Sequence, residues 1–302
     1  MSSRVRVSAL HRLHLEVDGN PDGQLVVLLH GGPGGLPDAR DLDFFPAERF
    51  RRVVFHQRGS GLSRPLGELT DNSLDRLADD MEAIRTRLGV GRWIVFGGSF
   101  GAAHALHYAE RFRDACAALV VHSVLLGRPG FETWDFDGSR DIDPAGWARL
   151  VAAIPGPPDL PPAERCFRAI LDGGPDATRA TRAWYARSTV LSRVSPAAVA
   201  EGQPRPTRGQ ARAAARLSAH YWLNRLFLPP GALLARAGRL RGLPGAILHG
   251  AEDRNCLPED ARDLSRAWTA ATLDVVPGAG HSVHEPAMAG TLAFRLKHLL
   301  AG

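Results

Sequence analysis

Apolar residues alternate with polar ones near the N-terminus and form short unbroken runs further along the chain. Residues 12–17 alternate strictly, as Arg-Leu-His-Leu-Glu-Val, which is typical of a strand with one side facing solvent. We therefore predict an antiparallel hairpin over 5–17 at a sheet edge. The other predicted strands are mostly continuous apolar runs, as in strands buried on both faces, and they lie at 25–29, 53–55, 93–96, 118–121, 246–250 and 272–276.

Helical periodicity separates these predicted strands. Apolar residues recur every three or four positions over 74–88, which predicts an amphipathic helix with Asn72 or Ser73 as its N-cap. Further helices are predicted over 102–112, 259–270 and 286–300. Strands that alternate with helices favour an α/β fold, with a mostly parallel sheet flanked by helices.

The alternation stops between about residues 127 and 242. Proline-rich stretches at 155–162 and 202–206 read as loops, and Ala/Arg-rich helical patterns lie between and after them. This segment is typical of a helical insertion. We predict one α/β core built from residues 1–127 and 242–302, with a helical cap over 128–241.

The amino-acid composition limits the kinds of molecule that the protein is expected to bind. The chain has 302 residues, 44% of them hydrophobic, and a formal net charge of +5. The positive charge comes from arginines scattered singly, which is unlike the basic patch of a nucleic-acid-binding protein. No apolar run approaches the roughly 20 residues of a membrane helix, and the three cysteines imply no disulfide framework. We expect a cytoplasmic protein that binds a small molecule or short peptide, with no nucleic acid and no membrane.

A G-x-S-x-G motif joins the strand over 93–96 to the helix over 102–112, with Ser99 at its centre. A serine on such a sharp turn stands clear of the sheet, and the glycines allow strand and helix to approach closely. An exposed serine is a weak nucleophile unless a base takes its proton. The motif therefore predicts a nucleophile if a base and an acid lie nearby.

Two residues late in the chain can supply that base and acid. Asp253 comes three residues after the strand that ends at Gly250, and His281 follows the strand that ends at Val276. Both positions are where loops leave the carboxyl end of a parallel sheet. The chain order serine, acid, histidine is the order of the α/β-hydrolase triad.

The sequence also allows other assignments of the acid and the base. Glu252 is an alternative acid and His284 an alternative base. His281 and His284, three residues apart, could also form a metal pair, but no third ligand pattern supports it. Cys256 lacks the turn that a nucleophile needs. We expect neither a metal nor an organic cofactor.

A glycine-rich turn, HGGPGG at 30–35, directly follows the strand over 25–29. Such a turn presents backbone N–H groups with no side chain in the way, and the Phe100 N–H can supply a second donor. Two donors aimed at one point stabilise the oxyanion of an acyl-transfer reaction.

Five motifs together resemble the proline iminopeptidase family of α/β-hydrolases. They are HGGPGG at 30–35, HQRGSGLS at 56–63, GGSFGAAHALHYAERF at 97–112, HGAED at 249–253 and GAGHSVHEP at 278–286. The resemblance covers nearly the whole chain. It implies the triad Ser99, Asp253 and His281, with oxyanion donors at Gly32 and Phe100. Family members need no cofactor and release an N-terminal proline or a related residue from small peptides.

The chain departs from the family pattern in places that matter for specificity. His56 replaces the aspartate of the family's DQRG motif. Arg187 and Ser188 stand where the cap of the family carries Trp-Glu, and Ser218 stands where it carries a second glutamate. In the family these two glutamates bind the ammonium of the substrate. The substrate-binding residues that we predict from this comparison are Gly31, Trp184, Arg187, Ser188, Ser218 and Tyr221.

We therefore expect a serine hydrolase that cleaves a small amide or ester through an acyl-enzyme. Since both ammonium-binding glutamates are replaced by serine, at Ser188 and Ser218, and since Arg187 would repel an ammonium, N-blocked or uncharged acyl groups are the expected substrates. The alternatives are a genuine prolyl aminopeptidase in which other acids replace the lost glutamates, a non-catalytic binding protein, and a lyase or cofactor-free haloperoxidase on the same fold.

Overall fold

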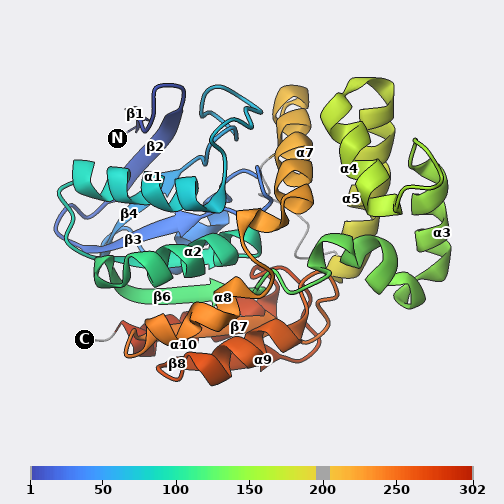
Figure 1. Ribbon diagram of the computed structural model, residues 1–302. Helices are drawn as coiled ribbons and strands as arrows, with labels where there is room; N and C mark the ends of the chain where they lie inside the picture. The colour runs from blue at the N-terminus through green and yellow to red at the C-terminus, as the bar shows by residue number, and fades with distance from the viewer. Residues whose placement is uncertain (1, 195–204, 301–302) are drawn as a thin grey trace.

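The computed structural model describes residues 2–194 and 205–300 of the chain. Eight strands of this part form a single sheet, and helices cover both of its faces (Figure 1). The order across the sheet is β1-β2-β4-β3-β5-β6-β7-β8. The strands are β1 (Ser2–Arg6), β2 (Arg12–Gly19), β3 (Gln24–Leu29), β4 (Phe50–Phe55), β5 (Trp93–Gly98), β6 (Cys116–His122), β7 (Gly245–Gly250) and β8 (Ala271–Val276).

The predicted edge hairpin is confirmed. β1 and β2 pair antiparallel, and β2 pairs antiparallel with β4, while all the remaining pairs from β4 to β8 are parallel. Leu13 and Leu15 are buried on β2, whereas Arg12 and Glu16 are exposed, so the alternation reflects one buried face. Because the other strands are parallel, their carboxyl ends share one edge of the sheet.

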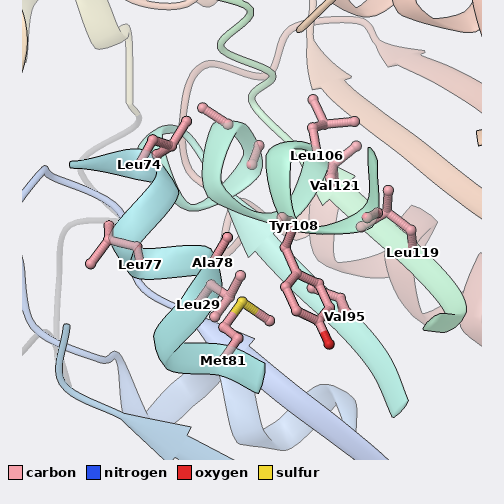
Figure 2. Close-up of a cluster of buried hydrophobic side chains, with 14 of the residues drawn as sticks. Leu29, Leu74, Leu77, Ala78, Met81, Val95, Leu106, Tyr108, Leu119 and Val121 are labelled. Carbon is pink, nitrogen blue, oxygen red and sulfur yellow. The ribbon is translucent and has the colours of Figure 1, made fainter. Parts of the chain in front are cut away.

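Helices pack on each face of the sheet through separate groups of buried side chains. Those at the core are α1 (Leu74–Arg87), α2 (Phe100–Arg111), α8 (Ala232–Arg236), α9 (Pro258–Ala267) and α10 (Pro286–Leu299). The apolar residues of α1 and α2 meet β3, β5 and β6 on one face (Figure 2). As predicted, α1 has Ser73 as its N-cap, whose side chain accepts a hydrogen bond from the Arg76 N–H.

One helix is shorter than predicted. The sequence predicts a helix to residue 270, but α9 ends at Ala267. Trp268 leaves the helix because its side chain is fully buried and its indole N–H donates to the Leu243 carbonyl at 2.9 Å. A turn at residues 269–270 then leads into β8.

Between β6 and β7 lie further helices that carry a hydrophobic cluster of their own. They are α3 (Pro144–Ala153), α4 (Pro162–Asp172), α5 (Gly174–Ser192) and α7 (Arg208–Leu223). In Figure 1, α7 stands between the sheet-bearing part and the helices α4 and α5. The loop predicted over 202–206 lies largely outside the described residues, and the cap boundaries at 128 and 241 stay a prediction.

Among the described residues, no helix is both long enough and apolar enough to cross a membrane.

Candidate active site

Ser99 occupies the sharp turn between β5 and α2. Its backbone has φ 57° and ψ −124°, a conformation that residues other than glycine rarely adopt. The turn is tight on both sides: a Cβ on Gly97 would lie 2.4 Å from the Gly101 carbonyl oxygen, and one on Gly101 would lie 2.3 Å from that of Leu29. The Ser99 N–H donates to the His122 carbonyl at 3.1 Å, which holds the turn against β6.

The structure brings Asp253 and His281 together, from loops that follow β7 and β8. His281 Nδ1 donates to Asp253 Oδ2 at 2.7 Å. The other carboxylate oxygen of Asp253 accepts the N–H groups of Asn255 at 2.9 Å and Cys256 at 3.1 Å. With both oxygens occupied, this fully buried carboxylate has one fixed orientation.

The pair shifts the protonation of both partners. Burial alone would raise the pKa of Asp253, but His281, together with the neighbouring His249, lowers it to about 2. Burial alone would lower the pKa of His281, yet the Asp253 carboxylate outweighs it and raises that pKa. Asp253 therefore stays ionised and stabilises a protonated His281.

Backbone contacts hold the His281 loop in place. Its N–H donates to the Ser192 carbonyl at 2.8 Å, and its carbonyl accepts from the Ser123 hydroxyl at 2.6 Å. No hydrogen bond joins Ser99 to His281 within the described residues, and the Ser99 side chain faces the same cavity as Cys256. Nucleophile–base hydrogen bonds are often looser before a substrate binds.

Two backbone N–H groups next to Ser99 are available as oxyanion donors. In the part of the chain that the structure describes, the N–H groups of Gly32 and Phe100 take part in no hydrogen bond. Gly32 has φ 126°, which requires glycine, and it lines the same cavity as Ser99. Gly31 packs beneath the serine, since a Cβ there would lie 3.4 Å from Ser99 Cβ. Its predicted role in substrate binding stays a prediction.

A cavity of about 370 Å³ opens over Ser99, between the sheet edge and the cap helices. Of the predicted substrate-binding residues, Trp184, Ser188 and Ser218 line it. Ser188 donates to Asn255 Oδ1 at 3.2 Å, and Ser218 donates to the Pro33 carbonyl at 2.9 Å. Both hydroxyls are therefore already hydrogen-bonded within the protein.

Arg187 does not line the cavity, so the prediction that it faces the substrate is wrong. Its guanidinium donates to Asp143 Oδ2 at 3.0 Å and to the Ser139 carbonyl at 2.5 Å, and its side chain is almost fully buried. The carboxylate of Asp143, inside the cap, therefore neutralises the charge of Arg187.

Tyr221 is likewise a packing residue. Its hydroxyl donates to Asn72 Oδ1 at 2.7 Å, and its ring lies 4.9 Å from that of Phe100. These contacts fasten α7 to the core next to the nucleophile turn, and Tyr221 does not line the cavity.

The sequence reasoning missed two carboxylates of the cavity wall, Asp135 and Asp260. Asp260 accepts from the Leu126 N–H and forms an ion pair with Arg128. Asp135 accepts a hydrogen bond from the indole N–H of Trp184 at 2.7 Å. The available signal for Asp135 is an acid placed between two aromatic residues, Trp134 and Phe136, in the cap.

The alternative assignments have other partners in the structure. His284 pairs with Asp41 at 3.0 Å, whereas His281 is the histidine that pairs with Asp253 through Nδ1. Cys256 is buried, and burial raises the pKa of its thiol, which opposes a nucleophilic role. The side chain of Glu252 forms no hydrogen bond or ion pair with any described residue.

His56, which departs from the family motif, directly follows the carboxyl end of β4, and its ring lies 6.5 Å from that of His30. Its Nδ1 accepts from the Leu62 N–H at 3.3 Å. Potential ligand atoms of His14, Glu16 and His56 lie within 4.8 Å of one another. The ion-pair contact of 2.8 Å between His14 and Glu16 accounts for part of this proximity.

The family model of the alpha/beta hydrolase fold matches residues 24–287. A proline iminopeptidase of Xylella fastidiosa is 37% identical over 288 residues, covering 91% of this chain and 89% of the relative. One from Neisseria gonorrhoeae is 34% identical over 304 residues, covering 99% of this chain and 96% of the relative. This chain belongs to the proline iminopeptidase family of α/β-hydrolases.

Solved structures agree on the fold. The crystal structure of a proline iminopeptidase from Mycobacterium smegmatis superposes with a TM-score of 0.64 at 20% identity, covering 100% of this chain and 99% of that one. A thermophilic esterase from Thermogutta terrifontis gives 0.66 at 20% identity, over 100% of this chain and 98% of that one. The predicted fold class and the prediction of a hydrolase are confirmed.

Proposed function

We propose that this hydrolase is a prolyl aminopeptidase, which releases a free N-terminal proline from a small peptide or amide. The relatives named proline iminopeptidase, at 33–37% identity over more than nine-tenths of the chain, support this proposal. It replaces the expected preference for N-blocked substrates. That preference rested mainly on the loss of the family's two glutamates, but the cavity wall contains two other carboxylates, Asp135 and Asp260. The second argument for it was repulsion by Arg187. That arginine is bound to Asp143 and lies outside the cavity.

The observation that carries the proposal is the charge of the cavity wall. Of the described charged side chains that line it, two are aspartates, Asp135 and Asp260, and one is Arg128. Arg128 is paired with Asp260 and also with Asp263. The remaining charge is therefore negative, which suits a substrate with a free, positively charged N-terminus.

In the proposed mechanism His281 Nε2 takes the proton of the Ser99 hydroxyl as its oxygen attacks the substrate carbonyl. The hydrogen bond from Nδ1 to Asp253 leaves Nε2 as the acceptor and stabilises the imidazolium that forms. The N–H groups of Gly32 and Phe100 bind the oxyanion of the tetrahedral intermediate. His281 then returns its proton to the leaving amine.

The prolyl ester on Ser99 is hydrolysed by the same groups. His281 removes a proton from water, which attacks the ester carbonyl, and the oxyanion occupies the same two N–H donors. Collapse of this second intermediate breaks the bond to Ser99 Oγ, which regains the proton from His281. The products are free proline and the shortened peptide, and no external cofactor enters the balance.

The test compares kcat/KM for prolyl 4-nitroanilide with that for its N-acetylated form, which differs only in the charge and bulk at nitrogen. We expect the free form to be preferred by about 100-fold or more, since an unpaired buried charge typically costs 2–5 kcal/mol. The serines at positions 188 and 218, in place of the family's glutamates, favour the opposite result. A preference for the N-acetylated substrate would exclude the aminopeptidase and identify a hydrolase of blocked acyl groups.

A further inference from the structure

Asp135 is a buried acid in the wall of the cavity that contains Ser99. It belongs to the irregular turn Trp134–Gly138, at the start of the cap, and only 8% of its surface is exposed. Asp135 and Ser99 line the same cavity, so a substrate bound over the serine lies next to this acid.

One oxygen of this carboxylate is in use and the other is open. Oδ2 accepts the hydrogen bond from Trp184, whereas Oδ1 accepts none from any described residue. The indole N–H fixes the orientation of the carboxylate. A carboxylate held by one oxygen presents the other as an acceptor for a ligand.

Asp135 also has no cation bonded to it within the described residues. Arg187, on the same helix as Trp184, gives its guanidinium to Asp143 and Ser139. Arg128, across the cavity, is bound by Asp260 and Asp263. Burial raises the pKa of Asp135 to about 6, although Trp184 and Arg187 act in the opposite direction. A buried anion without a bonded cation is costly, and a positively charged ligand removes that cost.

The surroundings of Asp135 fit a small apolar ring. The aromatic side chains that line the cavity are Phe131, Trp134, Trp184, Tyr185 and Trp222. Aromatic faces attract cations and pack against aliphatic rings. A pyrrolidinium ring combines these two properties, with its charge on a ring atom.

We propose that Asp135 binds the positively charged imino group of the substrate's N-terminal proline, as an anchor that replaces the two glutamates the chain lacks at Ser188 and Ser218. The assignment rests on the proposed function for its substrate. Asp135 lies on a different element of the cap from Ser188 and Ser218, and Trp184 holds it in position. Asp135 thereby determines specificity for a free N-terminus.

The experiment measures binding without turnover, in the Ser99→Ala variant. The probes are L-prolinamide, which is charged, and N-acetyl-L-prolinamide, which is not, with dissociation constants from calorimetry. Asp135→Asn keeps an acceptor for the Trp184 indole and removes the charge. Asp176→Asn is the matched control, because Asp176 is also in the cap but is exposed and paired with Arg179.

We expect Asp135→Asn to weaken L-prolinamide binding by about 30-fold or more and to change the acetylated probe by less than about threefold. Asp176→Asn should change neither. The assignment is overturned if L-prolinamide does not bind, if its affinity is unaffected by Asp135→Asn, or if both probes weaken alike. Failure of the wild-type enzyme to release proline, with the charge-dependent binding intact, would refute the proposed function and leave this site standing.

Discussion

In the proposed mechanism, the hydrogen bond between Asp253 and His281 sets the pH range in which His281 can act as a base. His281 accepts a proton from Ser99 only in its neutral form. Because the Asp253 carboxylate raises the pKa of His281 against the effect of burial, the neutral form is lost at a higher pH than for an ordinary histidine. The activity should therefore fall on the acid side as pH drops through that raised pKa.

Replacing Asp253 with asparagine should change both the rate and this acid limb. The Asp253 carboxylate is the main group that raises the pKa of His281 against burial, so its loss lowers that pKa and moves the acid limb of kcat/KM to lower pH. The loss of the correct tautomer should cost about 10⁴-fold in kcat. The measurement is a pH profile of 4-nitrophenyl acetate hydrolysis by both proteins. An acid limb at the same pH in the variant would show that another group controls it.

At the scale of single residues, sequence reasoning located groups at strand ends and failed for side chains of the cap. Ser99, Asp253 and His281 follow strands whose order the apolar runs reveal, and the structure places them at one edge of the sheet. Arg187 and Asp135 lie in the cap, where a charge can face a cavity or a neighbouring helix. Only the packing of the helices decides which, and local sequence does not record that packing.

At the scale of elements, α7 packs directly against the glycine-rich turn that contains Gly32, one of the two proposed oxyanion donors. Gly34, with φ 74°, approaches this helix so closely that an added Cβ would lie 2.7 Å from Leu217 Cδ1 and 3.1 Å from Ala214 Cα. Ser218 adds its hydrogen bond to the Pro33 carbonyl. The turn and the cap helix therefore support each other.

Gly34→Ala should destabilise the protein more than a glycine substitution with the same backbone strain elsewhere. Gly89 is the matched control, since it has φ 67° and nothing within 4 Å of its added Cβ. Both variants incur the left-handed backbone cost of about 1–2 kcal/mol, and Gly34→Ala adds overpacking of about 1–3 kcal/mol. Urea unfolding of both variants gives the comparison. Equal losses of stability would mean that α7 does not press on the turn.

The elements themselves were predicted well where periodicity is strong. The edge hairpin, the buried strands and α1 and α10 agree closely with the pattern of apolar residues. The sequence did not predict where α9 ends, because the end depends on the hydrogen bond from the Trp268 indole to the Leu243 carbonyl. That contact joins residues 25 positions apart, so it has no local signal.

At the scale of the whole molecule, a parallel sheet brings distant segments of the chain to one edge. The oxyanion turn follows β3, Ser99 follows β5, Asp253 follows β7 and His281 follows β8, and these strands lie within one continuous sheet. The helices between β6 and β7 cover this edge and close the cavity. Sequence order alone indicated this assembly, because strand–helix alternation in an α/β chain constrains the topology. The charge inside the cavity followed from the structure alone.

The measurement that tests the account most directly is covalent labelling by a diphenyl phosphonate analogue of proline with a free imino group. A serine nucleophile activated by His281 should attack the phosphorus, and the free imino group should bind in the negatively charged cavity. We expect modification of the Ser99 peptide alone, at a rate well above that of the N-acetylated reagent, and no label in Ser99→Ala. Labelling that persists in Ser99→Ala, or faster labelling by the N-acetylated reagent, would contradict the account.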